Sequence, residues 1–295
     1  MLFSVREMIS HKNVSAVIIT YNPNVKILNS LIQSLLMQVQ DIIVVDNSSA
    51  ELDLKNKIVQ SSEIIYLSDG INKGIATAQN IGISHAIDMG RDAVWIFDQD
   101  SELGELSLVA MADELNTFDG KAACIGPSIV NSFNDQVELP IKKVKNPNGT
   151  FCVDQIIASG SLTPTSVFKD IGVMEDELFI DAVDFEWCWR ARSLDYSVLI
   201  STQKMVHSVG DGDETCLGGL LTLKVSSPFR LYYQVRNYLI LLRRSYVPIR
   251  WKIRHSAFFV FKYFYFGFGR PQSKDYRTNI TSGFRDGLKI GFRRK

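Results

Sequence analysis

Short apolar runs alternate with amphipathic helical segments through the first half of the chain, and this alternation constrains the fold more than any other feature. Strand-like runs cover 14–20, 41–46, 64–67, 93–98 and 122–126, with helix-like segments at 25–37, 74–89 and 106–118. Between residues 25 and 37, for example, Leu28, Leu31, Ile32, Leu35 and Leu36 recur at the spacing of one helix face. Repeated units of this kind predict an α/β fold with a Rossmann-like, mostly parallel sheet flanked by helices.

The pattern weakens in the second half. Residues 127–154 collect Pro, Asn, Lys and Gly and predict a long loop or hairpin near the site. Thr163-Pro164 predicts the N-cap and first residue of a short helix that ends at Gly172. A helix at 184–194, a strand at 197–200 and two long helices at 228–244 and 248–268 complete the prediction.

The formal net charge of zero hides an asymmetry between the two ends of the chain. From Phe229 to Lys295 there are 16 Lys or Arg against two acids, and 17 of the 31 aromatic residues. We therefore expect an α/β domain at 1–228 and a helical, basic and aromatic C-terminal segment at 229–295. Basic side chains among aromatic rings are typical of peripheral attachment to an anionic membrane surface. The alternative is a helical layer that only packs on the core, and we expect no nucleic-acid partner.

The remaining composition indicates the compartment. The four cysteines are scattered without a Cys-x-x-Cys pair, so neither a zinc site nor a disulfide framework is predicted. The first 13 residues lack the apolar stretch of a secretory signal, and the apolar runs near Lys262 fall short of the roughly 20 residues of a spanning helix. We expect a cytoplasmic protein at the inner face of the membrane.

Polar residues follow the predicted strands, where ligands bind in open parallel sheets. They are Thr20-Tyr21-Asn22, Asp46-Asn47-Ser48-Ser49, Asn72-Lys73-Gly74 and Asp98-Gln99-Asp100. Gly-x-Gly-x-x-Gly and Walker-type loops are absent from these places, which argues against nicotinamide cofactors and ATP hydrolysis. The pattern predicts a different nucleotide ligand.

Asp98 and Asp100 are the candidate metal residues within this set. Two positions apart in extended backbone, their carboxylates point to the same side. Oxygen ligands of this kind suit Mg²⁺ or Mn²⁺, which is commonly shared with substrate phosphates. By itself an Asp-x-Asp pair is a weak signal, because two loop acids are more often solvated.

Taken in order, these motifs resemble those of family 2 glycosyltransferases of the GT-A fold. The matching elements are Asp46, the Asn72-x-Gly74 turn followed by Asn80, and Phe97-Asp98-Gln99-Asp100. Three later segments, 179–190, 207–211 and 230–237, are similar to the bacterial rhamnosyltransferase branch. The resemblance covers about residues 14 to 244.

The resemblance implies a role for each matching residue. Asp46 would accept a hydrogen bond from the pyrimidine, with Thr20, Asn22 and Asn72 lining the nucleoside pocket. Asp98 would face the sugar of the nucleoside, and Asp184 would be the catalytic base. Asp100 and His207 would hold the divalent metal. Gly74, Asn80, Arg190 and Arg236 would make further contacts with the nucleotide sugar. Many relatives read Glu-Asp where this chain has Val183-Asp184, which leaves Asp184 as the one carboxylate at that step.

The implied activity is the inverting, metal-dependent transfer of L-rhamnose from dTDP-rhamnose to a hydroxyl of a saccharide. The implied acceptor is linked to a polyprenyl diphosphate, as in the synthesis of surface polysaccharide or O-antigen. A galactofuranosyl or other hexosyl transferase with a UDP-sugar is the close alternative. A sugar nucleotidyltransferase and a non-catalytic membrane-associated binding module are more remote. The Gln-x-x-Arg-Trp motif of processive synthases is missing at Gln234.

Each candidate residue also has a structural interpretation. Asp184, Glu186 and Arg190 could form an acidic helix start and an i,i+4 ion pair. His207 could be a hydrogen-bonded core histidine, Asp46 could cap a turn, and the arginines could form surface ion pairs. The functional interpretation depends on the joint order of the motifs.

Overall fold

A single large sheet forms the centre of the chain in the computed structural model, which describes residues 8–104, 106–131, 137–138, 140, 143–207, 213–216, 221–224, 226–268 and 273–293. Ten strands of these described residues join in the order β3-β2-β1-β4-β9-β5-β10-β8-β7, with β6 paired to β5. Their bounds are β1 Val14–Thr20, β2 Asp41–Asp46, β3 Ile64–Leu67, β4 Ala93–Asp98, β5 Ala122–Asn131, β6 Val137–Glu138, β7 Lys143–Lys145, β8 Phe151–Val153, β9 Ser161–Pro164 and β10 Ser197–His207.

The strands that carry the predicted site are all parallel. β1 lies between β2 and β4, and β3 flanks β2. β9 runs antiparallel between β4 and β5, and β10 is parallel to β5. The predicted α/β fold with a mostly parallel core is confirmed.

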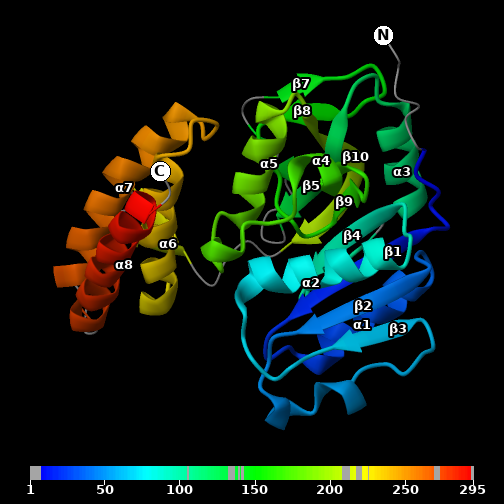
Figure 1. Cartoon of the computed structure of the whole chain (residues 1–295), viewed down its shortest axis with the longest axis horizontal. Helices are drawn as coiled ribbons and strands as arrows, with labels where there is room; N and C mark the ends of the chain where they lie inside the picture. Colours follow the sequence, from blue (N-terminus) through cyan, green and yellow to red (C-terminus); the bar gives the residue numbers. More distant parts are fainter. Residues whose placement is uncertain are drawn as a thin grey trace.

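Helices cover both faces of the sheet because alternate strand residues point to opposite sides (Figure 1). Val17 and Ile19 of β1 pack in one cluster with α2 Gly74–Asp88, α4 Val167–Ile171 and α5 Val183–Ser193. Ala16 and Ile18 pack on the other face with α1 Val25–Leu36 and α3 Leu108–Thr117. Every residue of β1 is buried, as expected for a strand covered on both faces.

The prediction of a helix starting at Thr163-Pro164 was wrong. Both residues belong to β9, where Thr163 pairs with Val94 and Pro164 with Ala93 of β4. Pairing with a central strand outweighs the local helix-start signal, and Pro164 is tolerated because it is the last residue of the strand. The short helix starts later, at Val167, and ends at Gly172 with φ +83° as predicted. The predicted hairpin region contains the antiparallel pair β7 and β8.

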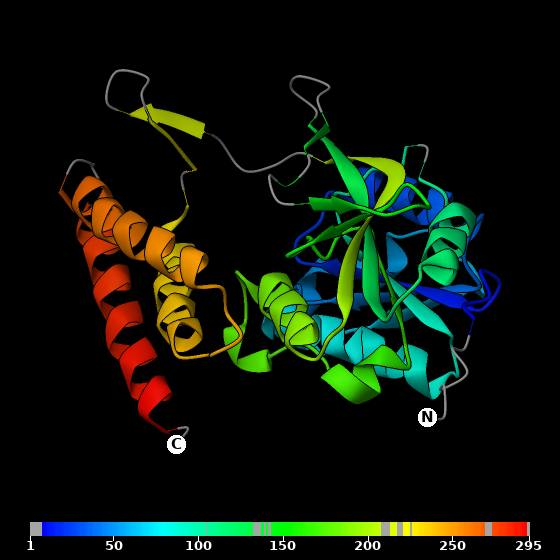
Figure 2. The same cartoon turned by 90° about the horizontal axis from the view of Figure 1, so that it is seen from above.

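The C-terminal helices form a layer at one end of the sheet domain (Figures 1 and 2). They are α6 Pro228–Leu242, α7 Ile249–Phe268 and α8 Ser273–Arg293, and the last was not predicted. α8 approaches α6 closely at Gly283, where a Cβ would lie 2.4 Å from the carbonyl oxygen of Tyr232. Among the described residues, no helix combines the length and the apolar character needed to cross a bilayer.

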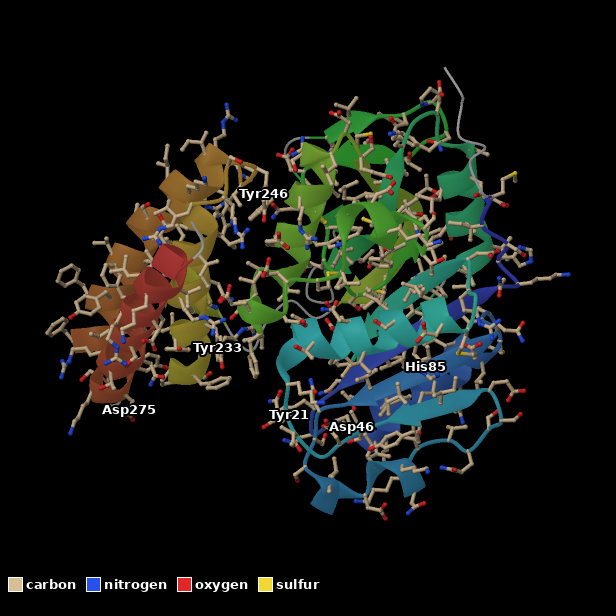
Figure 3. All side chains as sticks on the ribbon, in the orientation of Figure 1. Tyr21, Asp46, His85, Tyr233, Tyr246 and Asp275 are labelled. Carbon is tan, nitrogen blue, oxygen red and sulfur yellow. The ribbon has the colours of Figure 1, made fainter. Side chains whose placement is uncertain are left out.

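The C-terminal layer also contacts the sheet domain. The Trp251 ring of α7 meets the Trp189 ring of α5 edge to face, with centroids 5.0 Å apart. Tyr233 and Tyr246 lie between the layer and the sheet domain (Figure 3). A separate two-stranded sheet, β11 Asp213–Cys216 and β12 Leu221–Lys224, precedes α6. The division at residue 228 remains a prediction.

Candidate active site

The carboxyl ends of β1, β2 and β4 bring three predicted site residues together. The sheet register pairs Thr20 with Asp46 and Ile19 with Asp98. Because β1 lies between the other two strands, Asp46 and Asp98 flank the end of β1. This edge of the sheet is the floor of the candidate site.

Asp46 is the centre of a buried hydrogen-bond network. One carboxylate oxygen accepts from Thr20 Oγ1 at 2.8 Å and from the Ser48 amide at 2.9 Å. The other accepts from the Tyr66 hydroxyl at 2.6 Å. Burial, and then the bond to Asp46, raise the pKa of the Tyr66 phenol well above its usual value. The network therefore fixes the carboxylate at the edge of the sheet, where Figure 3 shows it near Tyr21.

A cavity of about 360 Å³ opens beside this network. It is lined by Asp46, Tyr66 and Ser68 and by the residues around two 3₁₀ turns, η1 Ala50–Leu52 and η2 Leu54–Asn56. The volume lies in the range of roughly 300 to 1,000 Å³ that is typical of ligand sites. It is the candidate nucleoside pocket.

Asn22 lies in a turn held by Ser48 and Gln99, two residues for which the sequence motifs imply no role. Asn22 has φ +47°, and its amide donates to Ser48 Oγ at 2.7 Å. The preceding amide, of Tyr21, donates to Gln99 Oε1 at 2.7 Å. Gln99 thus ties the end of β1 to the residues that follow β4. Its position between Asp98 and Asp100 was the sequence feature that could have indicated this role.

Asn72 and Gly74 build the start of α2. The Asn72 side chain accepts from the Gly74 amide at 2.9 Å, and Gly74 has φ +82°. A Cβ on Gly74 would lie 2.5 Å from the Phe179 ring, so α2 starts directly against the turn before α5. The next amide, of Ile75, donates to the Phe179 carbonyl at 2.7 Å.

Asp184, the predicted base, is the second residue of α5 and faces the Asp98 side of the site. Its carboxylate accepts from the Phe185 amide at 2.9 Å. Burial raises the pKa of Asp184 to about 7, and the negative charge of Asp98 adds to the rise. A carboxylate whose pKa lies near neutrality is suited to take a proton from a hydroxyl.

The predicted metal residues lie on neighbouring segments. Asp100 is exposed, and the backbone of Glu102 bridges to Val206, next to His207 at the end of β10. The His207 side chain lies outside the described residues. Within the described part of the chain, no three His, Cys, Asp or Glu side chains group closely enough to hold a metal ion. Asp100 offers one exposed carboxylate, and a metal held there would take further ligands from substrate oxygens.

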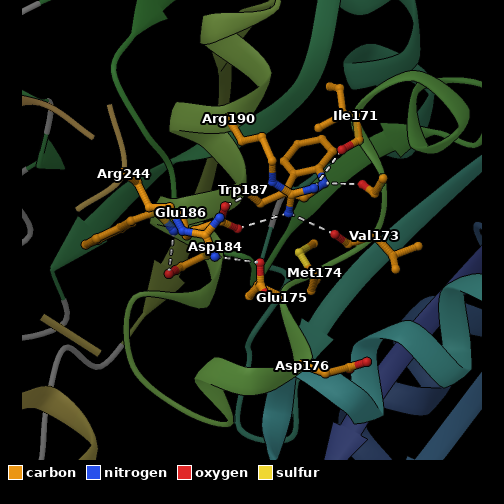
Figure 4. A network of polar contacts seen from close by, with 12 residues as sticks. Ile171, Val173, Met174, Glu175, Asp176, Asp184, Glu186, Trp187, Arg190 and Arg244 are labelled. Atoms are coloured by element: carbon orange, nitrogen blue, oxygen red, sulfur yellow. Dashed lines mark hydrogen bonds and ion pairs between the residues drawn. The ribbon is translucent and has the colours of Figure 1, made fainter. Parts of the chain in front are cut away.

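Arg190, one turn along α5 from Glu186, has a mostly buried side chain that several hydrogen bonds hold in place (Figure 4). Its guanidinium donates to both carboxylate oxygens of Glu186 at 2.9 Å and to the carbonyls of Ile171 and Val173 at 2.6 and 2.9 Å. Glu186 is 1% exposed and also accepts from the Tyr246 hydroxyl at 2.6 Å. The i,i+4 ion pair of the structural interpretation is therefore present, with a buried Glu186 carboxylate and an Arg190 side chain that is 20% exposed.

Arg236 and Asn80 hold the segment that leads to α5. Arg236 is buried, donates to the Glu177 carbonyl and lies 4.7 Å from the centroid of the Tyr233 ring. The Asn80 carboxamide donates to the Met174 carbonyl at 2.9 Å and accepts from the Met174 amide at 2.8 Å. Contact of either side chain with a nucleotide sugar stays a prediction.

The fold and site define a class of protein. A mostly parallel sheet with acids at the ends of β2 and β4, and a third carboxylate at the start of α5, is the arrangement of a GT-A transferase. The model of glycosyl transferase family 2 matches residues 15–167. The chain belongs to glycosyl transferase family 2 and is a glycosyltransferase.

Two curated relatives are similar in sequence. The dTDP-rhamnosyl transferase RfbF of Shigella flexneri is 36% identical over 263 residues, which are 84% of this chain and 86% of the relative. The low-salt glycan biosynthesis hexosyltransferase Agl10 of Haloferax volcanii is 26% identical over 201 residues, 61% of this chain and 62% of the relative.

Solved structures share the fold at low sequence identity. S. aureus TarS 1-349 in complex with UDP-GlcNAc has a TM-score of 0.55 at 14% identity, over 94% of this chain and 81% of that chain. GalNAc-T7 with UDP, GalNAc and Mn²⁺ has the same score and identity, over 95% of this chain and 56% of that chain.

Proposed function

We propose that this glycosyltransferase moves L-rhamnose from dTDP-rhamnose to a hydroxyl of a lipid-linked saccharide, with inversion at the anomeric carbon and with a divalent metal. The observation that carries the proposal is the Asp184 carboxyl at the start of α5, which lies close enough to Asp98 at the end of β4 for the charge of Asp98 to raise its pKa. The choice of dTDP-rhamnose as donor is supported by the 36% sequence identity of this chain to a dTDP-rhamnosyl transferase, over 84% of this chain and 86% of the relative.

The proposed step is an in-line displacement. The acceptor oxygen attacks the anomeric carbon, its proton passes to the Asp184 carboxylate, and the bond from that carbon to the diphosphate oxygen breaks. dTDP leaves with the electron pair. Asp184 suits this role because its raised pKa lets it hold the proton at neutral pH once the transfer is complete.

The donor would lie along the ends of β1, β2 and β4. The nucleoside occupies the cavity beside Asp46 and Tyr66, and Asp98 faces its sugar. Asp100 and His207 would hold Mg²⁺ or Mn²⁺. When bound, the metal neutralises charge on the diphosphate as it leaves.

The acceptor side of the proposal is supported by α7. Five of its apolar side chains are each more than 60% exposed, and their spacing places them along one face: Ile249, Ile253, Val260, Phe264 and Phe268. Arg250 and Arg254 are exposed at one end of this face, and α7 contains no acid. We propose that this face, called the α7 stripe, lies on an anionic membrane whose lipid-linked saccharide is the acceptor.

A UDP-sugar hexosyltransferase is the second candidate, favoured by the identity to Agl10, named a hexosyltransferase. Thermal unfolding with dTDP and UDP, each with and without Mn²⁺, tests the donor. A nucleotide at 100 times its Kd stabilises a protein by about 2.7 kcal/mol. We expect the larger Tm rise with dTDP and Mn²⁺. A rise with UDP alone would favour the hexosyltransferase, and no rise with either nucleotide would contradict the proposed nucleoside pocket.

A further inference from the structure

A turn of unusual backbone geometry leads into α5. Phe179, Asp181 and Ala182 have φ of 62°, 68° and 64°, although each carries a Cβ. Left-handed backbone is costly for such residues and persists only where the surroundings impose it. Ala182 is also the N-cap of α5 and offers no side-chain bond to the helix. The turn therefore needs support from elsewhere, and it ends two residues before Asp184.

Asn237 of α6 supplies that support. Its carboxamide nitrogen donates to the carbonyls of Leu178, Ile180 and Asp181 at 2.9, 2.7 and 3.0 Å. Its oxygen accepts from Arg236 Nε at 3.1 Å and Nη2 at 2.9 Å. The side chain is 1% exposed, so water does not replace these bonds. One buried amide thus ties three backbone carbonyls that lie 56 to 59 residues earlier in the chain.

Two further contacts hold the same turn. Arg230, on the exposed side of α6, pairs with Asp181 at 2.9 Å. The Phe179 ring stacks on Tyr233 with centroids 4.7 Å apart and planes 12° apart. With the bond from Ile75 of α2 to the Phe179 carbonyl, α2 and α6 fix the turn together.

We propose that Asn237 is a positioning residue for glycosyl transfer: by holding the turn from Leu178 to Asp181, it fixes the start of α5 and the direction of the Asp184 carboxylate. The inference rests on the proposed function, in which Asp184 takes the acceptor proton. Small displacements of a catalytic group of about 1 Å can lower a rate 100-fold. The nucleoside pocket lies at β1 to β3, where Asn237 makes none of the contacts described above.

The test compares Asn237→Leu with a matched variant. Leu has a volume similar to that of Asn but has no hydrogen-bond donor. The matched variant, Asn116→Leu, removes an amide that joins Ile9 to α3 through hydrogen bonds of 2.9 and 3.0 Å, on the opposite face of the sheet. We expect Asn237→Leu to lower kcat at least about 10-fold with the donor KM within about twofold. Asn116→Leu should keep kcat. An unchanged kcat in Asn237→Leu, or a parallel loss of donor binding, overturns the proposal.

A variant at the protein surface provides a second test in case Asn237→Leu impairs folding. Arg230→Gln removes the ion pair with Asp181 from a side chain that is 48% exposed. We expect it to lower kcat about threefold or more without changing the donor KM, and Arg230→Lys to restore most of the loss. An unchanged kcat in Arg230→Gln contradicts the account of the turn. Asp184→Asn separates the two claims: if it keeps full kcat, the proposed base fails, whatever Asn237 does.

Discussion

Replacing Asp184 by Asn should make the protein more stable and nearly inactive. The pKa of Asp184 rises from an ordinary 3.8 to about 7, chiefly through burial. Each pKa unit corresponds to about 1.4 kcal/mol, so ionised Asp184 costs the folded state up to about 4 kcal/mol. Asn has nearly the same shape, and the substitution removes this cost. It also removes the proposed base, so we expect a loss in kcat of about 10² to 10⁴.

The raised pKa also determines how the stability difference between Asp184→Asn and the wild type changes with pH. Below pH 3.8 the carboxyl is neutral in both states and costs nothing. Between 3.8 and about 7 the folded state binds more protons than the unfolded state, so the stability of the wild type falls as pH rises and levels off above 7. The stability advantage of Asp184→Asn should therefore grow by about 2 to 3 kcal/mol between pH 5 and pH 8.

Urea unfolding at pH 5, 6, 7 and 8, without nucleotide or metal, measures this advantage. Asp113→Asn, at an exposed position of α3, is the matched control and should show no comparable growth with pH. A constant advantage across this range, or a variant less stable than the wild type at pH 8, would refute the reasoning. Activity against pH should rise toward a plateau above about 7 in the wild type.

Three further substitutions test separate parts of the site. Gly74→Ala should lower the free energy of unfolding by about 2 to 4 kcal/mol, because the backbone there is left-handed and a Cβ would lie 2.5 Å from the Phe179 ring. The control Gly90→Ala, at φ +70° with no atom within 4 Å of the added Cβ, should lower it by only about 1 kcal/mol, and urea unfolding measures both. Tyr66→Phe removes the 2.6 Å bond to Asp46 and should raise the donor KM about 5-fold with little change in kcat, as measured by initial rates. Phe264→Ser, in the α7 stripe, should lower the fraction of protein that cosediments with anionic vesicles, while kcat on a water-soluble acceptor stays unchanged.

Local sequence signals predicted the elements around the candidate nucleoside pocket. The strands at 14–20, 41–46 and 93–98 appear with those bounds, because each is a short apolar run covered on both faces. The rule that ligands lie beyond the carboxyl ends of parallel strands then placed Thr20, Asp46 and Asp98 at one edge. The register shows these three residues at neighbouring strand ends, and their roles stay predictions.

Contacts between distant segments could not be predicted in this way. β9 inserts between β4 and β5, and only that pairing reveals Thr163 as a strand residue. Arg190 is directed to the carbonyls of Ile171 and Val173, which form no sequence pattern.

The support of the turn before α5 is also long-range. Asn237 donates hydrogen bonds to backbone carbonyls. Since every residue has such an acceptor, the sequence does not indicate which carbonyls a distant side chain will bind. Periodicity in the sequence thus predicted the strands and helices, whereas the role of Asn237 in holding the turn before α5 was not predicted, although Asn237 lies in the matching segment 230–237.

The most direct measurement is transfer from a panel of nucleotide sugars, with NMR analysis of the product. We expect turnover of dTDP-rhamnose with Mn²⁺ or Mg²⁺, a product of opposite anomeric configuration to the donor, and loss of that turnover in Asp184→Asn. Retention of configuration, or transfer from UDP-sugars with dTDP-rhamnose untouched, would contradict it.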